Sequence, residues 1–397
     1  MRNGWKTKTL EEVCQFTNGL WKGEKPPFVR VGVIRNTNFT KEGLLNDSDI
    51  AYLDVEAKKF ATRRLQFGDL ILEKSGGGPK QAVGRVALFD KSDGDFSFSN
   101  FTSALRVLDP DELDFRYLHK FLCWTYGSGL TERMQSHSTG IRNLNANAYK
   151  GIQIGLPPLP EQQRIVRLLD EAFKGIATAK ANAEKNLQNA SALFDSQLQS
   201  VFAHRGATWM QESLESLVSS GAVQLTRGKV ISKKDLAATP GEYPVYSSAR
   251  ENNGQFGAYG HFMFDEELIT WSVDGGGRLF HRQRHKFSVT NVGGILRILR
   301  PDQLSYAYLY RVLSYLHAQV RFDWVRKAHP SVILKLYDDI PVPPLAIQTR
   351  LAVSLEEVER ETKQLEAIYE RKLVALEELK TSLLHQAFTG QLGAPTA

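Results

Sequence analysis

The chain has 397 residues, 42% of them hydrophobic and 24% charged, which is the composition of a globular protein long enough for two or three domains. No apolar run reaches the roughly 20 residues of a membrane span, and the start MRNGWKTKTLEEV has no signal-peptide core, so we expect a cytoplasmic protein. Cys14 and Cys123 are too few for a disulfide framework, and the nine histidines show no metal-ligand spacing.

The net charge of +6 is unevenly distributed along the chain. Residues 1–155 carry 22 basic and 18 acidic side chains, and residues 207–342 carry 16 and 13. Residues 156–206 carry 6 and 5, and residues 343–397 carry 6 and 8. The positive excess favours contact of the first and third segments with a polyanion, although a few units of charge are common on proteins that bind no nucleic acid.

The first 155 residues predict a globular domain of mixed helix and strand. A short helix begins near Trp5, and GDLILEKSGGG (68–78) predicts a buried strand followed by a polar turn. Two strand-like runs follow in FSFSNFTSALRVL (96–108), and residues 117–126 predict an aromatic helix.

A long helix follows this domain. After PPLPEQQR (157–164) the chain runs to Phe202 with no further proline, and apolar or small residues recur in steps of three and four. Such a narrow seam is typical of a coiled coil. Its larger members are Ile165, Leu169, Ile176, Leu187 and Leu193.

The third segment repeats the first. WMQESLESL (209–217) matches WKTKTLEEV (5–13), and EELITWSVDGGG (266–277) matches the strand and glycine turn at 68–78. FSVTNVGGILRIL (287–299) then matches the paired strands of the first domain, and a second aromatic helix follows. The chain therefore carries two related domains.

The long helix also returns. PPLAIQTR (343–350) opens a proline-free run to Phe388, and the two copies align without a gap at a constant offset, 343 − 157 = 186. The alanine-rich seam of the first copy faces a bulkier seam, which predicts that the helices pack on each other. The alternative is that each helix packs on its own domain or forms a homodimer. The seam of the second copy is carried by Leu351, Leu355, Leu365, Leu373 and Leu379.

Connectivity predicts how the helices run. Because the ends of a compact domain usually lie close together, the second helix should start near the end of the first and run antiparallel to it. The sequence therefore predicts an α+β chain with two domains separated by a rod of roughly 65 Å. Two related basic domains at a fixed spacing suggest recognition of a bipartite DNA site, whose halves lie about 34 Å or a multiple apart along one face.

Candidate DNA contacts come from polar loops. Arginine, asparagine and glutamine read base edges, and glycine-containing loops bring backbone amides to phosphates. The alternative for every candidate is a solvated loop whose glycines only supply left-handed turns. In the first domain the candidates are Arg35, Asn36, Asn38, Lys80, Gln81, Ser138, Thr139, Arg142, Asn143 and Asn145. In the second domain they are Ser247, Ser248, Arg250, Arg278, His281, Arg282, Lys327, His329 and Ser331.

The chain as a whole resembles the specificity subunit of type I restriction-modification enzymes. The resemblance rests on the paired motifs LPPLPEQQRIVRLLDEAF and PVPPLAIQTRLAVSLEEVE, on TGIRNLNANAYKGIQIGLPPL (139–159) and on QAFTGQL (386–392). It implies target-recognition domains at 1–155 and 207–342, each reading half of an asymmetric split DNA site. It also implies helical regions at 156–206 and 343–397 that form an antiparallel coiled coil, dock two methyltransferase subunits and are joined by endonuclease/translocase subunits. PPLAIQTR departs from the family pattern that PPLPEQQR follows.

The chain shows no catalytic motif of its own. An adenine methyltransferase needs an Asn-Pro-Pro-aromatic motif, and the nearest match, KPPF (25–28), has Lys25 in place of asparagine. We therefore expect no catalytic, cofactor-binding or metal-binding residue here, and expect S-adenosylmethionine, ATP and Mg on partner subunits. One rival is an architectural or bridging DNA-binding protein that acts alone. The other, a self-contained methyltransferase, is contradicted by the missing motifs.

Overall fold

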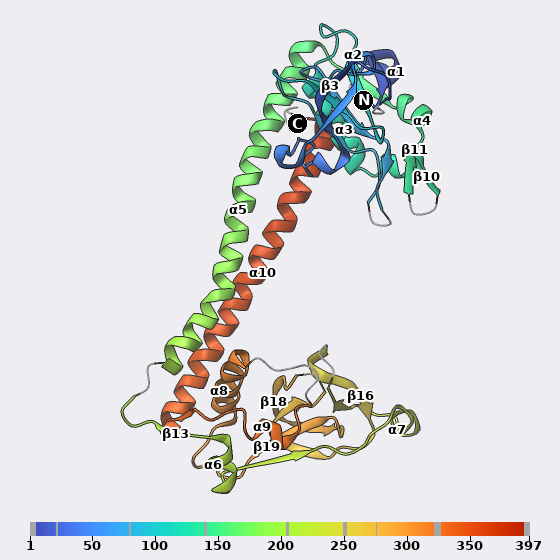
Figure 1. Cartoon of the computed structure of the whole chain (residues 1–397). Helices are drawn as coiled ribbons and strands as arrows, with labels where there is room; N and C mark the ends of the chain where they lie inside the picture. Colours follow the sequence, from blue (N-terminus) through green and yellow to red (C-terminus); the bar gives the residue numbers. More distant parts are fainter. Residues whose placement is uncertain are drawn as a thin grey trace. The chain divides into compact units, whose positions relative to one another are not determined.

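The computed structural model in Figure 1 describes residues 5–20, 23–78, 81–138, 141–203, 206–248, 252–274, 276–320 and 327–392. It forms two compact units, of which the first consists of Met1–Ala183 and Arg371–Ala397 and the second of Glu184–Glu370. The units divide inside the long helices, so each contains one globular part and a portion of both helices. The segment boundaries expected from the sequence stay predictions.

The described strands of the first unit form four small sheets. The antiparallel pair of β1 and β12 places Lys6 opposite Leu156, so the start of the globular part lies beside the last strand before the long helix. The strands are β1 (Lys6–Thr9) with β12 (Gln153–Leu156); β2 (Cys14–Asn18), β9 (Thr102–Val107), β5 (Leu70–Glu73) and β7 (Val86–Leu88); β4 (Ala51–Glu56), β3 (Phe28–Ile34) and β8 (Phe96–Phe98); and β10 (Gln135–Ser138), β11 (Ile141–Leu144) and β6 (Ser75–Gly76).

The aromatic helix of the first unit, α3 (Phe115–Gly127), packs into the core. Asp114 caps it by accepting hydrogen bonds from the backbone of Arg116 and Tyr117. Tyr117 lies in one apolar cluster with Leu169 of the first long helix and Phe388 of the second. The globular part is therefore packed onto both long helices. The short helices are α1 (Leu10–Val13), α2 (Ala57–Ala61) and α4 (Ala146–Lys150), with 3-10 turns at Asn36–Asn38, Asp47–Asp49 and Leu130–Met134.

The second unit gathers most of its strands in one sheet. Its six strands lie in the order β14-β19-β17-β18-β15-β16, and a separate pair, β13 with β20, closes the globular part as β1 and β12 do in the first unit. The strands are β14 (Val223–Arg227), β19 (Gly293–Ile298), β17 (Phe264–Ser272), β18 (Leu279–Val289), β15 (Tyr243–Tyr246), β16 (Gln255–Tyr259), β13 (Met210–Glu212) and β20 (Ile340–Val342). The helices are α6 (Leu214–Ser219), α7 (Lys233–Ala238), α8 (Tyr306–Gln319) and α9 (Pro330–Ile333), with a 3-10 turn at Asn252–Gly254.

The two long helices are α5 (Leu159–Ala203) and α10 (Leu345–Thr389), each 45 residues long. In the first unit Lys180 Nζ lies 2.6 Å from Glu377 Oε1, and Arg164 Nη2 donates to Leu392 O at 3.2 Å. Residues later in α5 therefore contact residues earlier in α10, so the two helices run antiparallel. In the second unit Ser191 Oγ donates to Glu366 Oε1 at 2.7 Å. The prediction of an α+β chain with two related domains and two long antiparallel helices is confirmed.

The seam between the helices differs in detail from the expected one. Ile165, Leu169, Ile176 and Leu355 are buried, and Leu187, Leu351 and Leu373 are half-buried. Leu193, Leu365 and Leu379, in contrast, are 49%, 38% and 47% exposed and lie off the seam. After Ala190, the next inward-facing side chains are those of Phe194 and Leu198. Phe194 lies four residues after Ala190, whereas the predicted seam used the apolar residue three positions on, Leu193. Glu366 and Lys380 similarly face inward one position after Leu365 and Leu379.

Candidate nucleic-acid interface

The two domains carry the same glycine hairpin on the same framework. In the first unit the Glu73 N–H donates to Arg85 O at 2.8 Å, and the Gly84 N–H donates to Glu73 O at 2.9 Å. In the second unit the Ser272 N–H donates to Arg278 O at 3.0 Å, and the Gly277 N–H donates to Ser272 O at 3.1 Å. Eleven residues separate the first pair (85 − 73 − 1) and five separate the second (278 − 272 − 1).

These hydrogen bonds correct the alignment of the glycine triplets. The sequence comparison paired Gly76–Gly78 with Gly275–Gly277, whereas the structure pairs Gly84 with Gly277. Both of these glycines have a positive φ, 106° and 75°, which a residue with a side chain rarely adopts. The first hairpin is therefore the second one lengthened by six residues, and the two present different loops.

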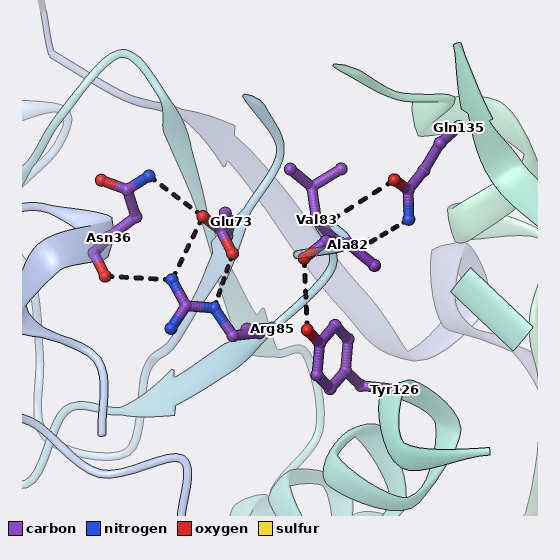
Figure 2. Close-up of polar contacts among 7 residues, drawn as sticks. All are labelled: Asn36, Glu73, Ala82, Val83, Arg85, Tyr126 and Gln135. Atoms are coloured by element: carbon purple, nitrogen blue, oxygen red, sulfur yellow. Dashed lines mark hydrogen bonds and ion pairs between the residues drawn. The ribbon is translucent and has the colours of Figure 1, made fainter. Parts of the chain in front are cut away.

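A buried ion pair lies under the first hairpin, as Figure 2 shows. Glu73 is 1% exposed and binds Arg85 through both carboxylate oxygens, with Nε to Oε2 at 2.7 Å and Nη2 to Oε1 at 3.2 Å. Asn36 donates to Glu73 Oε1 at 3.0 Å, and its carbonyl accepts from Arg85 Nη2 at 3.2 Å. This network joins the loop at residue 36 to the base of the hairpin.

Two side chains hold the far side of the same hairpin (Figure 2). Gln135 donates to Val83 O at 3.1 Å and accepts from Val83 N at 3.4 Å, and Tyr126 OH donates to Ala82 O at 3.2 Å. In the second unit, His317 Nε2–H donates to Gly276 O at 2.8 Å from the corresponding part of α8. Tyr337 OH donates to His317 Nδ1 at 2.9 Å, and burial lowers the pKa of His317, so the neutral ring holds the turn.

The structure brings together three of the loops expected to contact DNA in the first domain. Asn143 and Arg142 of β11 lie opposite Ser75 and Gly76 of β6, and Ser75 Oγ donates to Asn143 Oδ1 at 2.6 Å. Arg142 Nη1 reaches Gln135 Oε1 at 3.4 Å. The exposed Gln81 amide lies beside Arg85, and its oxygen accepts from Arg85 Nη2 at 2.9 Å once it is turned toward the guanidinium. The polar loops therefore meet around the hairpin.

Other candidates in the first domain have roles within the fold. Asn38 is buried and donates to the carbonyls of Asn46 and Asp49, which corrects the expectation that it contacts DNA. Arg35 Nη2 pairs with Asp49 Oδ2 at 2.9 Å, and Asn145 caps α4 by accepting from Ala148 N. Lys80 and Thr139 lie outside the described residues, and of Ser138 the structure describes only the main chain, in β10.

In the second domain, the expected serines and lysine gather around two neighbouring turns. Ser247 Oγ accepts from Thr290 Oγ1 at 2.9 Å, and Ser248 Oγ accepts from the Asp274 N–H at 3.1 Å. Lys327 Nζ lies 3.3 Å from Asp274 Oδ1. These contacts tie the loop after β15 to the turns after β17 and β18.

The remaining candidates of the second domain are dispersed. Arg278 is exposed, with its guanidinium 5.4 Å from the centre of the Phe280 ring, and Ser331 is exposed on α9. His281 Nε2–H donates to Glu267 Oε1 at 2.6 Å, and Arg227 Nη1 lies 3.5 Å from His329 Nδ1. Arg250 lies outside the described residues. Arg282 is buried, which removes it as a direct base contact in this conformation.

A pair of matching glutamines anchors the framework beneath these loops. Gln162 donates to Glu112 O at 2.8 Å and to Pro157 O at 2.9 Å, and it accepts from Asp114 N at 2.9 Å. Gln348 repeats the pattern with Gln303 O, Pro343 O and Ser305 N at 2.8, 2.8 and 2.9 Å. Both side chains are fully buried. The offset of 186 found in the sequence thus reproduces one set of hydrogen bonds twice.

The aromatic helices repeat as well. Tyr117 OH donates to Gly155 O and Tyr308 OH donates to Pro341 O, each at 2.9 Å. Tyr117 packs edge-on against Phe388, the last aromatic residue of α10, and Tyr308 packs against Phe202, the last of α5. Each globular part is therefore tied to the start of one long helix and the end of the other.

Within the described ranges, no group of three or more His, Cys, Asp and Glu side chains could hold a metal ion. Burial lowers the pKa of His119 to about 4, and its Nε2–H donates to Gly43 O at 2.8 Å inside the fold. Among the residues that the structure describes, no helix is long and apolar enough to cross a membrane.

Sequence reasoning missed several residues of these sites. Arg85, Tyr126 and Gln135 hold the first hairpin, yet each is a single polar residue in an apolar or mixed stretch. Asn252 and Asn253 are exposed on a turn of the second domain, and the Asn-Asn-Gly sequence there was an available turn signal. The other missed residues, Arg85, Tyr126 and Gln135, take their roles from contacts between segments that are distant in the sequence.

Two copies of one framework, each presenting a different set of polar loops, define a recognition protein with two domains. The chain belongs to the type I restriction modification DNA specificity domain family, whose model matches residues 2–188 and 208–373. The family resemblance read from the sequence is thereby confirmed.

Several relatives resemble parts of this chain in sequence, and two solved structures share its fold. The type I restriction enzyme MpnII specificity subunit of Mycoplasma pneumoniae is 31% identical over 132 residues, 32% of this chain and 39% of that protein. The chain spans 42% and 47% of two further relatives from the same organism. The HsdS subunit of Thermoanaerobacter tengcongensis shares the fold with a TM-score of 0.66 at 17% identity, covering 99% of this chain and 98% of that one. A chain from a structure of complex assembly and conformational transition of the type I R-M system shares the fold with a TM-score of 0.75 at 18% identity, covering 99% of this chain and 99% of that one.

Proposed function

We propose that this chain is the DNA sequence-specificity subunit of a type I restriction-modification complex, and that each of its domains reads one half of a bipartite asymmetric site. The observation that carries the proposal is the duplicated framework with unlike loops. Gln162 and Gln348 make the same three hydrogen bonds, whereas the hairpins above them differ by six residues. Related frameworks dock alike on a duplex, and different loops read different bases.

In the first domain, the half-site is read by the loops that meet around the Glu73–Arg85 pair. A network of hydrogen bonds holds these loops before DNA arrives, which lowers the entropic cost of binding. In the second domain, the loop after β15 and the turns after β17 and β18 take this role. The contacts of Ser247 with Thr290 and of Ser248 with Asp274 support this assignment, because they hold the three segments side by side.

The paired helices set the spacer between the half-sites. An α-helix of 45 residues is about 68 Å long, which is about two turns of B-DNA. The same helices dock two methyltransferase subunits through apolar side chains that stay exposed outside the seam. These are Leu168, Leu193, Val353, Leu365, Ile368, Val374 and Leu379.

Methyl transfer and cleavage belong to partner subunits. The methyltransferase subunits hold S-adenosylmethionine, and the endonuclease/translocase subunits hold ATP and Mg. The missing methyltransferase motif supports a non-catalytic role for this chain. An architectural protein that acts alone would instead bind DNA without directing any methylation.

A domain exchange tests the proposal. Residues 1–155 are replaced by the first domain of another family member, and methylated positions are mapped in cells that carry the full-length chain with its methyltransferase partner. We expect one half of the methylated motif to change and the other half and the spacer to persist. A change in both halves, or no methylated motif that depends on this chain, would contradict the proposal.

A matched deletion tests the spacer. Lys180 pairs with Glu377 and Ser191 with Glu366, so paired positions add up to 557 in both units. Removing residues 177–183 together with 374–380 keeps this pairing and shortens the helices by about 10 Å, or about three base pairs. A seven-residue block nearly preserves the helical phase. A shorter spacer with unchanged half-sites is expected, and an unchanged spacer would refute the role of the helices.

A further inference from the structure

Arg282 is a buried cation in the second domain. It is 2% exposed, and its guanidinium carbon lies 3.6 Å from the centre of the Tyr246 ring and 4.6 Å from that of the Phe280 ring. Burial lowers the pKa of Arg282 to about 10, so the group is still charged at neutral pH.

Its partners are all neutral. Nε donates to Thr270 Oγ1 at 3.0 Å and Nη2 donates to Asn253 O at 2.9 Å, while Nη1 is buried without a hydrogen-bond acceptor among the described residues. Two arginines of the first domain differ in their partners, because the partly exposed Arg85 and Arg106 both pair with buried carboxylates. A buried charge without a counter-charge costs several kcal/mol. A position needed only for packing would be more stable with an apolar side chain.

The guanidinium fixes an unusual turn. Asn252, Asn253 and Gly254 have φ angles of 48°, 52° and 77°, so three successive residues lie in the left-handed region. Arg282 holds the turn at Asn253 O, and the Ser247 N–H holds it at Gly254 O at 2.9 Å. A Cβ on Gly254 would come within 3.2 Å of Arg282 Nη2, so a side chain there would press on the guanidinium as well as strain the left-handed backbone.

The turn presents two amides to solvent. Asn252 and Asn253 are both exposed, although their backbone is clamped from inside by a charged side chain. An asparagine amide offers one donor side and one acceptor side, which match N7 and the N6 amino group of adenine in the major groove. The positive charge beneath the turn also favours the approach of a polyanion.

We propose that the Asn252–Gly254 turn is the adenine-reading contact of the second domain and that Arg282 is its positioning residue. This inference rests on the proposed function, because it assigns one contact within the second half-site. The first domain has no equivalent among the described residues, since its positive-φ residues there are all glycines. The turn therefore discriminates within one half-site only.

The test removes the amides and keeps the backbone. In N252G/N253G, glycine adopts the left-handed conformation without strain, so the turn and the fold persist. The full-length chain with its methyltransferase partner is used to select DNA from a library randomised in both half-sites. We expect discrimination at one or two adjacent A·T pairs of the second half-site to fall about 10- to 100-fold, with the first half-site unchanged. Unchanged preference at every position overturns the inference.

A second variant tests the positioning role. R282M replaces the buried cation with an apolar side chain of similar length, so the melting temperature should hold or rise. Discrimination at the same A·T pairs should fall, because Asn253 O loses its donor. The slope of affinity with salt should change by less than one phosphate contact, since Arg282 does not reach the DNA itself.

Two outcomes contradict this role. A lower melting temperature with unchanged base preference would make Arg282 a structural residue only. A salt slope that falls by a full contact with equal loss for all sequences would make it a phosphate ligand. A wild-type chain that selects no DNA motif would refute the proposed function itself, whereas a wild-type motif that N252G/N253G reads equally well refutes only this inference.

Discussion

The buried glutamines give the sharpest test of the duplicated framework. Q162L replaces a fully buried amide with an apolar side chain of similar size, so little cavity is left and the effect comes from hydrogen bonds. The Asp114 N–H and the carbonyls of Glu112 and Pro157 lose their partners inside the protein. At about 1 to 1.5 kcal/mol for each of these three groups, the free energy of unfolding of the first unit should fall by about 3 to 4.5 kcal/mol.

The second unit should respond in the same way to Q348L. Ser305 N, Gln303 O and Pro343 O are the groups left unpaired there, and neither glutamine shares a hydrogen-bond partner with the other. The two losses should therefore add in the double variant. Gln163, the exposed neighbour of Gln162, gives the control: Q163L should change stability by less than about 0.5 kcal/mol.

Hydrogen exchange read by mass spectrometry locates each loss. Q162L should lower protection in β1, β12 and α3 by roughly 100-fold or more and leave β13, β20 and α8 nearly unchanged, and Q348L should do the reverse. A loss below about 1 kcal/mol would show that the amide contributes little. Equal loss of protection in both units would refute the assignment of one glutamine to one framework.

Three further changes test other parts of the structure. E73Q leaves the half-buried Arg85 guanidinium without its counter-charge and should lower the melting temperature by the equivalent of about 3 kcal/mol, whereas E73Q/R85M should recover most of it; no recovery would refute the ion-pair explanation. Acidification from pH 7 to pH 5 should destabilise the first unit by about 2 kcal/mol through His119, because the unfolded histidine, with a pKa near 6.5, takes up a proton that the folded ring, with a pKa of about 4, does not. The contribution of His119 to the free energy of unfolding is complete above pH 6.5 and is lost as the pH falls toward 4. Urea titrations of H119Q should lack this part of the pH dependence. L169A in the helix seam should cost about 3 kcal/mol in the same titration and L193A less than about 1 kcal/mol, and equal losses would contradict the seam assigned here.

The long helices were predictable because their signal is local and repeated. Two runs of 45 residues with apolar steps of three and four indicate helices, because the first has a proline only in its first turn, at Pro160, and the second has none. The constant offset of 186 indicates duplication. The seam failed at Leu193, Leu365 and Leu379 for a physical reason. The direction of a side chain follows from the helix phase and from what faces it, and an apolar residue one position off that phase lies at the surface.

The recognition sites were predictable only as loops. The sequence located the polar segments around residues 36, 76–81 and 142–143, and the structure brings them together around Glu73 and Arg85. Asn38 and Arg282 have the same chemistry as their neighbours in the sequence, yet both are buried. No local pattern separates a buried polar side chain from an exposed one.

The sequence by itself determined the duplication, the two domains of mixed helix and strand, the two long helices and the family, because each of these is written in spacing and repeated motifs. Only the tertiary structure decided which glycine of each hairpin corresponds to which, which polar side chains stabilise the fold and which face solvent. Those outcomes depend on hydrogen bonds between residues far apart in the chain, such as Gln162 with Asp114 or Arg282 with Asn253, whose energies exist only after folding brings the partners within reach.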